Sequence, residues 1–194
     1  MLPGIVIPGS DPTDNLPVIP PYLGKGDVIG ITSPAGYITL PEIQPAIQLI
    51  QSWGYNIRIG NTIGKRDFTF GGTDQERADD FQQMLDDRDV KAILCARGGY
   101  GSVRIVDQLK WERFRAHTKW IIGFSDITVL HSHLNKNLGI ASIHSKMCNS
   151  FPEVWSQADP LQADTILSIA RAISGTTMKY TAPYNNRNRL GNCE

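Results

Sequence analysis

Hydrophobic positions along this chain follow two alternating patterns. Short apolar runs predict buried strands at residues 28–32, 55–59, 90–95, 119–123 and 140–143. Longer segments with apolar residues every three or four positions predict amphipathic helices over residues 41–53, 75–86, 102–109, 125–137 and 161–174. A further run at residues 178–184 is a candidate last strand. Because short strands that alternate with helices are typical of βαβ units, the pattern predicts an α/β fold with a doubly wound, mostly parallel sheet.

Residue types that stop or cap helices predict one end of each of the first two helices. Gly54 is expected to stop the first helix, and Thr73 or Asp74 to cap the second one. Six prolines precede residue 22 and predict an irregular leader over residues 1–20.

Three segments are expected at the edge of the sheet where parallel strands end, which is where such folds place their chemistry. They are residues 33–36, 97–101 and 124–126. In the last of them an apolar strand runs through Gly123 into Ser125 at a helix start, the context of a nucleophile elbow. The alternative is that Ser125 only caps the following helix, and this local pattern alone favours capping.

The second segment reads Arg97-Gly98-Gly99-Tyr100-Gly101. Its glycines allow close approach of the backbone to a ligand, and its N–H groups could bind an anion or stabilise an oxyanion beside Ser125. The spacing matches neither common phosphate-binding motif, and an ordinary glycine turn is the alternative. The first segment, Ser33 to Gly36, is of interest only for its position.

A serine nucleophile needs a base, and the four histidines do not supply an obvious one. His131 and His133 lie roughly 9–12 Å from Ser125 along the same predicted helix, too far to take its proton. His117 precedes a strand and is expected at the opposite edge. His144 follows a short strand, and we interpret it as structural or substrate-facing. Either Ser125 is not catalytic, or its base lies outside this chain.

Composition narrows the function classes. The 194 residues carry 19 Lys+Arg and 19 Asp+Glu, so no basic surface for nucleic acid is indicated. No apolar run is long enough to span a membrane. Three cysteines without CxxC spacing disfavour a disulfide framework and a zinc site, and no metal or other cofactor is predicted. The apolar N-terminus is short and no basic segment precedes it, so it is not an intact signal peptide, and this pattern leaves the compartment open. We expect the cytoplasm, or the periplasm if an export signal was removed.

Taken together and in order, four motifs resemble the LD-carboxypeptidase family, the serine peptidases (family S66) that trim murein peptides. Residues 21–36 are similar to the family's opening strand, and residues 70–80 to its segment rich in Gly, Thr, Asp, Glu and Arg. Residues 96–102 read Ala-Arg-Gly-Gly-Tyr-Gly-Ser, and residues 122–128 resemble the segment that carries the nucleophile. The resemblance extends over about residues 20–194.

The resemblance implies a Rossmann-like or flavodoxin-like N-terminal domain over residues 21–183 and a linker that begins at residues 184–194. It implies a Ser-Glu-His triad in which Ser125 is the nucleophile. Oxyanion donors would be the N–H of Asp126 and one from Gly98 or Gly99. Substrate contacts are expected from residues at the same edge: Ser33, Arg97, Tyr100 and His144. The implied reaction cleaves an L-to-D amide and releases terminal D-alanine from a murein tetrapeptide.

The chain departs from the family pattern in two places. His144-Ser-Lys-Met147 replaces the usual His-Gly-Pro-Met, so substrate detail near Lys146 is open. The family's catalytic Glu and His belong to a C-terminal β domain, which we expect to be missing here, so that this chain alone is expected to be inactive. Alternatives are a microcin-immunity-type peptidase of the same family, a non-catalytic α/β domain that binds a ligand, or a truncated product without function. Family members are often homodimers, so a homodimer is a further expectation.

Overall fold

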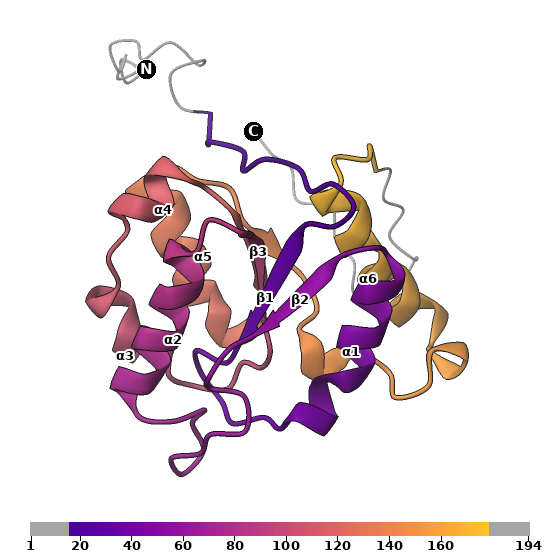
Figure 1. The fold of residues 1–194 in the computed structure, drawn as a ribbon, viewed down its shortest axis with the longest axis horizontal. Coiled ribbons are helices and arrows are strands. Elements are labelled where there is room, and N and C mark those ends of the chain that lie inside the picture. Colours follow the sequence, from indigo (N-terminus) through magenta and orange to yellow (C-terminus); the bar gives the residue numbers. More distant parts are fainter. Residues whose placement is uncertain (1–15, 179–194) are drawn as a thin grey trace, which may run out of the picture.

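The computed structural model describes residues 16–178, and its centre is a five-stranded, all-parallel sheet (Figure 1). The strands, in chain order, are β1 (Val28–Thr32), β2 (Asn56–Ile59), β3 (Val90–Cys95), β4 (Trp120–Gly123) and β5 (Ile143–His144). Their spatial order is β2-β1-β3-β4-β5. This confirms the predicted doubly wound sheet, in its flavodoxin-like order, with the change of winding direction between β1 and β3.

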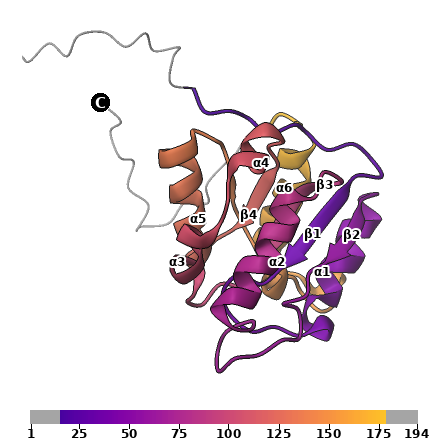
Figure 2. The same cartoon turned by 60° about the vertical axis from the view of Figure 1, so that its left-hand side comes forward.

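Helices cover both faces of the sheet. They are α1 (Leu40–Ser52), α2 (Asp74–Asp86), α3 (Ser102–Ile105), α4 (Glu112–Ala116), α5 (Thr128–His133) and α6 (Pro160–Ile173). Helices α1 and α6 lie on one face and the other four on the opposite face; the turned view shows α2 in front of the sheet (Figure 2). Successive β3 residues alternate between the two cores: Leu94 packs with α1 and α6, whereas Ile93 packs with α2 and α5.

The predicted helix ends at α1 and α2 are confirmed. Gly54 follows α1 with φ +92°, a conformation that glycine adopts without strain. Thr73 caps α2: its hydroxyl accepts the Glu76 N–H, and the Glu76 carboxylate accepts the Thr73 N–H.

Other predicted boundaries were wrong. The helix expected over residues 102–109 is α3 followed by a 3-10 turn at Val106–Gln108. The helix expected over residues 125–137 is a 3-10 turn at Ser125–Ile127, then α5, then a π-helical end at Leu134–Leu138. The short helix α4 was not predicted at all, because five residues are too few to show a helical period.

The strand expected over residues 140–143 is β5, which begins only at Ile143. Ile140 instead forms an isolated parallel bridge with Val18, whose N–H donates to Gly139 O and whose carbonyl accepts the Ala141 N–H. A residue of the leader therefore takes part in pairing at this position. The candidate strand at residues 178–184 lies almost entirely outside the described residues.

Candidate active site

The three segments expected at one edge of the sheet do meet there. The Gly36 N–H donates to the Gly98 carbonyl at 2.9 Å, which joins the turn after β1 to the turn after β3. A Cβ added to Gly98 would lie 3.3 Å from Ser125 Cβ, so the turn after β4 packs against the same glycine. Residues from three strand ends thus share one small region, beside the place where the winding direction changes.

Ser125 has a backbone conformation that few serines adopt. Its φ is +59°, in the left-handed region, and it begins a 3-10 turn directly after β4 and Phe124. The residue is exposed; its hydroxyl caps no helix and takes part in no hydrogen bond among residues 16–178. The capping alternative therefore does not describe Ser125, whereas a sharp strand-to-helix turn with a presented hydroxyl fits the nucleophile elbow.

Three backbone N–H groups beside Ser125 have no acceptor among the described residues. Within the described part of the chain, the N–H groups of Gly98, Gly99 and Asp126 donate to no acceptor. Gly99 has φ +110°, and a side chain on Gly98 would press on Met147 at 3.2 Å as well as on Ser125. The backbone conformation therefore favours glycine at Gly99, and a side chain on Gly98 would require Met147 and Ser125 to shift by a few tenths of an ångström.

The carboxylate of Asp126 has a structural partner. Its Oδ2 accepts the Ser102 N–H at 2.8 Å, at the start of α3. This bond ties the turn that carries Ser125 to the helix after the glycine turn. Sequence reasoning assigned Asp126 only a backbone role, and the side-chain contact adds a second one.

The expected substrate-binding residues differ in accessibility. Arg97 is exposed and donates from Nη1 to the Tyr37 carbonyl at 3.2 Å. Tyr100 is 56% exposed, with its ring centroid 6.2 Å from that of Phe70. His144 is exposed, and its ring meets Phe124 edge-on. All three stay predictions as substrate contacts.

Ser33 is placed differently from these three residues. It is fully buried, its N–H donates to Thr62 Oγ1, and its hydroxyl donates to the Gly36 carbonyl. These bonds brace the turn after β1 from inside. A direct contact between Ser33 and a substrate stays a prediction, and the described position favours a supporting role.

Arg77, to which sequence reasoning gave no role, connects the loops of this edge. It lies on the inner face of α2 and is fully buried. Its guanidinium donates to the carbonyls of Pro34, Gly72 and Gly101, and pairs with Asp74. Burial lowers the pKa of Arg77, and Asp74 opposes that shift. The signal that could have found it is a charged residue four positions before Phe81, in the apolar stripe of a helix.

Asp80 has a similar role, about one turn further along α2. Its carboxylate accepts hydrogen bonds from the Thr32 and Thr62 hydroxyls and from the Asn61 N–H, which joins the ends of β1 and β2. Arg77 and Asp80 together fix the loops after β1, β2 and β3 to one helix. This edge of the sheet is therefore held by a buried polar framework whose carbonyls and hydroxyls are satisfied.

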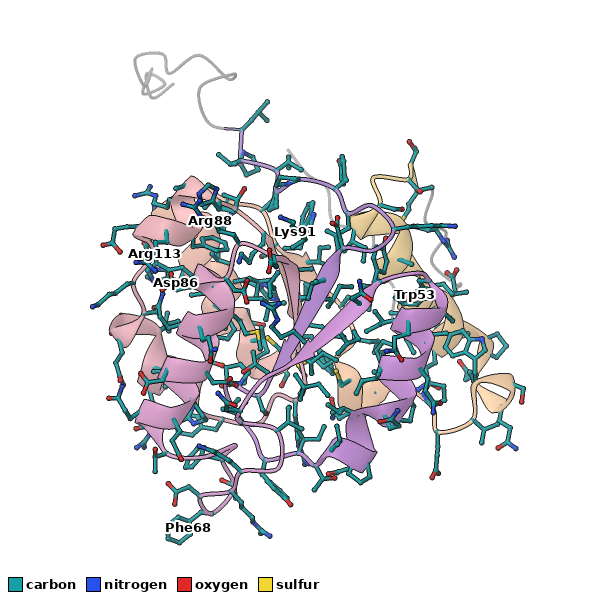
Figure 3. All side chains as sticks on the ribbon, in the orientation of Figure 1. Trp53, Phe68, Asp86, Arg88, Lys91 and Arg113 are labelled. Atoms are coloured by element: carbon teal, nitrogen blue, oxygen red, sulfur yellow. The ribbon has the colours of Figure 1, made fainter. Side chains whose placement is uncertain are left out.

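None of the four histidines bonds to Ser125. Both ring nitrogens of His131 are engaged by Ser142 and Gly123, and the His133 ring stacks on Trp111. His117 lines a cavity of about 460 Å³ together with Arg88 and Lys91. Arg88 and Lys91 lie at the opposite end of the molecule from Phe68, whose loop adjoins the candidate site (Figure 3). The described residues thus bring together an exposed serine and backbone N–H groups without acceptors, but no histidine bonded to that serine. They contain no group of side chains suited to hold a metal ion.

This geometry agrees with the comparison with known families. The profile of the LD-carboxypeptidase N-terminal domain matches residues 29–145, more than half of the chain. The chain belongs to the LD-carboxypeptidase family. The motifs that carry the resemblance lie within or next to the matched range, and Ser125 and the glycine turn are both inside it.

Curated relatives carry peptidase names. A Bacillus subtilis protein named "Probable murein peptide carboxypeptidase" is 33% identical over 131 residues, which cover 68% of this chain and 41% of that protein. The murein tetrapeptide carboxypeptidase of Pseudomonas aeruginosa is 27% identical over 143 residues, 73% of this chain and 46% of the relative. This chain therefore spans less than half the length of these relatives.

The microcin C7 self-immunity protein MccF of Escherichia coli is 29% identical over 171 residues, 86% of this chain and 49% of MccF. A solved structure of MccF in complex with aspartyl sulfamoyl adenosine superposes with a TM-score of 0.75 at 27% identity, covering 86% of this chain and 51% of that one. Separately, none of the helices described between residues 16 and 178 is long and apolar enough to cross a membrane.

Proposed function

We propose that this chain is the nucleophile-bearing region of a serine-type LD-carboxypeptidase that cleaves an L-to-D amide of murein peptides. The observation that carries the proposal is the left-handed backbone of Ser125 at the end of β4, which presents an unbonded hydroxyl beside the Gly98–Gly99 turn. Strained residues of this kind are concentrated at functional sites. Family membership and the names of the murein-peptide relatives support the choice of substrate.

In the proposed reaction, Ser125 Oγ attacks the carbonyl carbon of the scissile amide while its proton passes to a base. The developing oxyanion accepts hydrogen bonds from the Asp126 N–H and from an N–H of the glycine turn. The tetrahedral intermediate then collapses, the C–N bond breaks, and the amine of D-alanine leaves with the proton. Water hydrolyses the acyl-serine ester and restores the hydroxyl. The family pattern supplies the base and its orienting acid from a Glu and a His that match no position in residues 16–178.

Charged and aromatic groups at the site suit a peptide with a free carboxylate. Arg97 is exposed beside the glycine turn, where its guanidinium can pair with the terminal carboxylate of the substrate. Tyr100 lies in the glycine turn just before α3, His144 ends β5, and both offer ring faces to the rest of the peptide. These roles rest on position at the shared edge of the sheet.

The proposal is tested by Ser125→Ala and Gly98→Ala variants of the full-length protein. D-Alanine release from murein tetrapeptide is expected to fall by about 10³-fold or more in Ser125→Ala, because the nucleophile is gone. Gly98→Ala is expected to lose much of kcat, since its methyl group meets Ser125. A fluorophosphonate probe should label Ser125 in the wild type. Unchanged turnover in Ser125→Ala contradicts the proposal; lost turnover with retained peptide binding separates the enzyme from a non-catalytic binding domain.

A microcin-immunity-type peptidase is the second candidate, because the similarity to MccF covers more of this chain than the similarity to the murein enzymes. A peptidyl sulfamoyl adenosine and a murein tetrapeptide, offered to the same preparation, distinguish the two. The substrate whose kcat/KM is at least about tenfold higher decides between the murein-peptide and the microcin-immunity function. That ratio corresponds to a difference of about 1.4 kcal/mol in transition-state binding.

We place the reaction in the cytoplasm, with the periplasm as the alternative, and expect a homodimer. Fractionation of cells and the molar mass of the purified protein test these two expectations separately.

A further inference from the structure

The imidazole of His131 lies next to the turn that carries Ser125, and both of its nitrogens have partners. On helix α5, its Nε2 is 3.0 Å from the Gly123 carbonyl oxygen, and its Nδ1 is 2.8 Å from Ser142 Oγ. Gly123 is the last residue of β4 and stands two positions before Ser125. The ring therefore contacts the backbone at the point where the strand turns toward the serine.

These partners determine where the ring proton lies. A carbonyl only accepts, so Nε2 carries the proton and donates to Gly123. In the neutral ring Nδ1 is then the acceptor, and the Ser142 hydroxyl donates to it. Burial lowers the pKa of His131, and nearby His144 adds to that shift while the bond to Gly123 opposes it. The neutral ring is thus held in one tautomer and one orientation.

The Gly123 carbonyl is fixed from two sides. It accepts the Ser145 N–H, from the segment after β5, at 2.9 Å, in addition to the His131 proton. Around it the packing is close: a Cβ on Gly123 would come within 2.8 Å of Ile127. Since left-handed serine persists only where its surroundings enforce it, the groups that hold Gly123 also hold the backbone of Ser125.

We propose that His131 is a positioning residue for Ser125: its Nε2–H anchors the Gly123 carbonyl at the start of the nucleophile turn, and Ser142 fixes the tautomer that makes this possible. This inference rests on the proposed function of Ser125. It makes His131 neither the base nor a substrate contact.

Three variants of the full-length protein test it. His131→Leu removes the anchor, whereas His131→Gln places an amide N–H near the position of Nε2. His133→Leu is the matched control, because His133 is on the same helix but stacks on Trp111, away from Gly123. We expect kcat to fall about 10- to 100-fold in His131→Leu with KM within about twofold, since small misplacements of a nucleophile are costly. His131→Gln should recover most of kcat, and His133→Leu should keep it.

A second readout keeps the inference separate from the proposed function. A crystal structure of His131→Leu should show Ser125 moved from its left-handed φ, whereas the His131→Gln variant should retain it. The inference is overturned if His131→Leu keeps the kcat of the wild type. It is also overturned if His131→Leu and His131→Gln lose kcat equally and in proportion to their loss of thermal stability. If Ser125→Ala remains active, the proposed function fails. The crystal structure still tests the inference in that case, because an unchanged φ of Ser125 in His131→Leu shows that His131 does not position the turn.

Discussion

At the scale of the residue, Ser125 combines strain with exposure. A left-handed φ costs an L-residue about 1–2 kcal/mol, and glycine escapes most of that cost. We therefore expect the unfolding free energy of Ser125→Gly to be about 1 kcal/mol higher than that of Ser125→Ala, although both lack the hydroxyl. Urea unfolding of the two variants measures the difference. Equal unfolding free energies of the two variants would show that residue 125 leaves the left-handed region once the hydroxyl is absent.

His131 gives the protein a dependence of stability on pH. Its pKa in the folded state is lowered, with burial as the main cause, so below about pH 6.5 the unfolded chain binds a proton that the folded chain resists. Stability from this group is therefore complete above that pH and is lost as the pH falls toward the lowered pKa. His144 is the titratable group that faces it. The loss of unfolding free energy between pH 7.5 and 5.5 should be smaller in His131→Gln than in the wild type, and equal losses would contradict this assignment.

At the scale of the element, helix α2 carries the polar framework of the edge where the candidate site lies. Arg77→Met keeps much of the side-chain volume but leaves the carbonyls of Pro34, Gly72 and Gly101 without their donor. We expect a loss of about 3 kcal/mol in unfolding free energy, together with lower kcat. Arg88→Met is the control, because Arg88 is exposed at the opposite end of the sheet, where it lines a cavity. A loss no larger than in this control would show that the framework does not depend on Arg77.

The accuracy of the sequence prediction follows from the length and periodicity of each element. Strands β1 and β4 were found to within one residue, because apolar runs between charged or glycine-containing turns leave little choice. Strand β5 has two residues, and helix α4 has five, so neither carries a period. The three turns of the site could be placed at one edge because parallel strands share their carboxyl ends. The left-handed Ser125 and the bonds of Arg77 depend on contacts between distant segments, which a local pattern does not contain.

At the scale of the whole molecule, the strand order explains why the site is where it is. The winding direction changes between β1 and β3, so their connecting loops diverge to opposite faces and leave the ends of both strands accessible. Strand β4, next to β3, adds Ser125 to the same place. In the proposed function, this edge of the sheet carries the nucleophile and the oxyanion donors, and the base is a group outside residues 16–178.

This division predicts how the 194-residue chain behaves alone. Its two buried cores on one sheet should unfold in a single cooperative transition, yet it should release no measurable D-alanine, because no described histidine bonds to Ser125. The full-length protein, assayed in parallel, is the positive control. Turnover by the short chain at the full-length rate would place a base inside it. His144 would then be the first residue to test, because its ring lies against Phe124 beside the serine, and His144→Gln would have to abolish that activity.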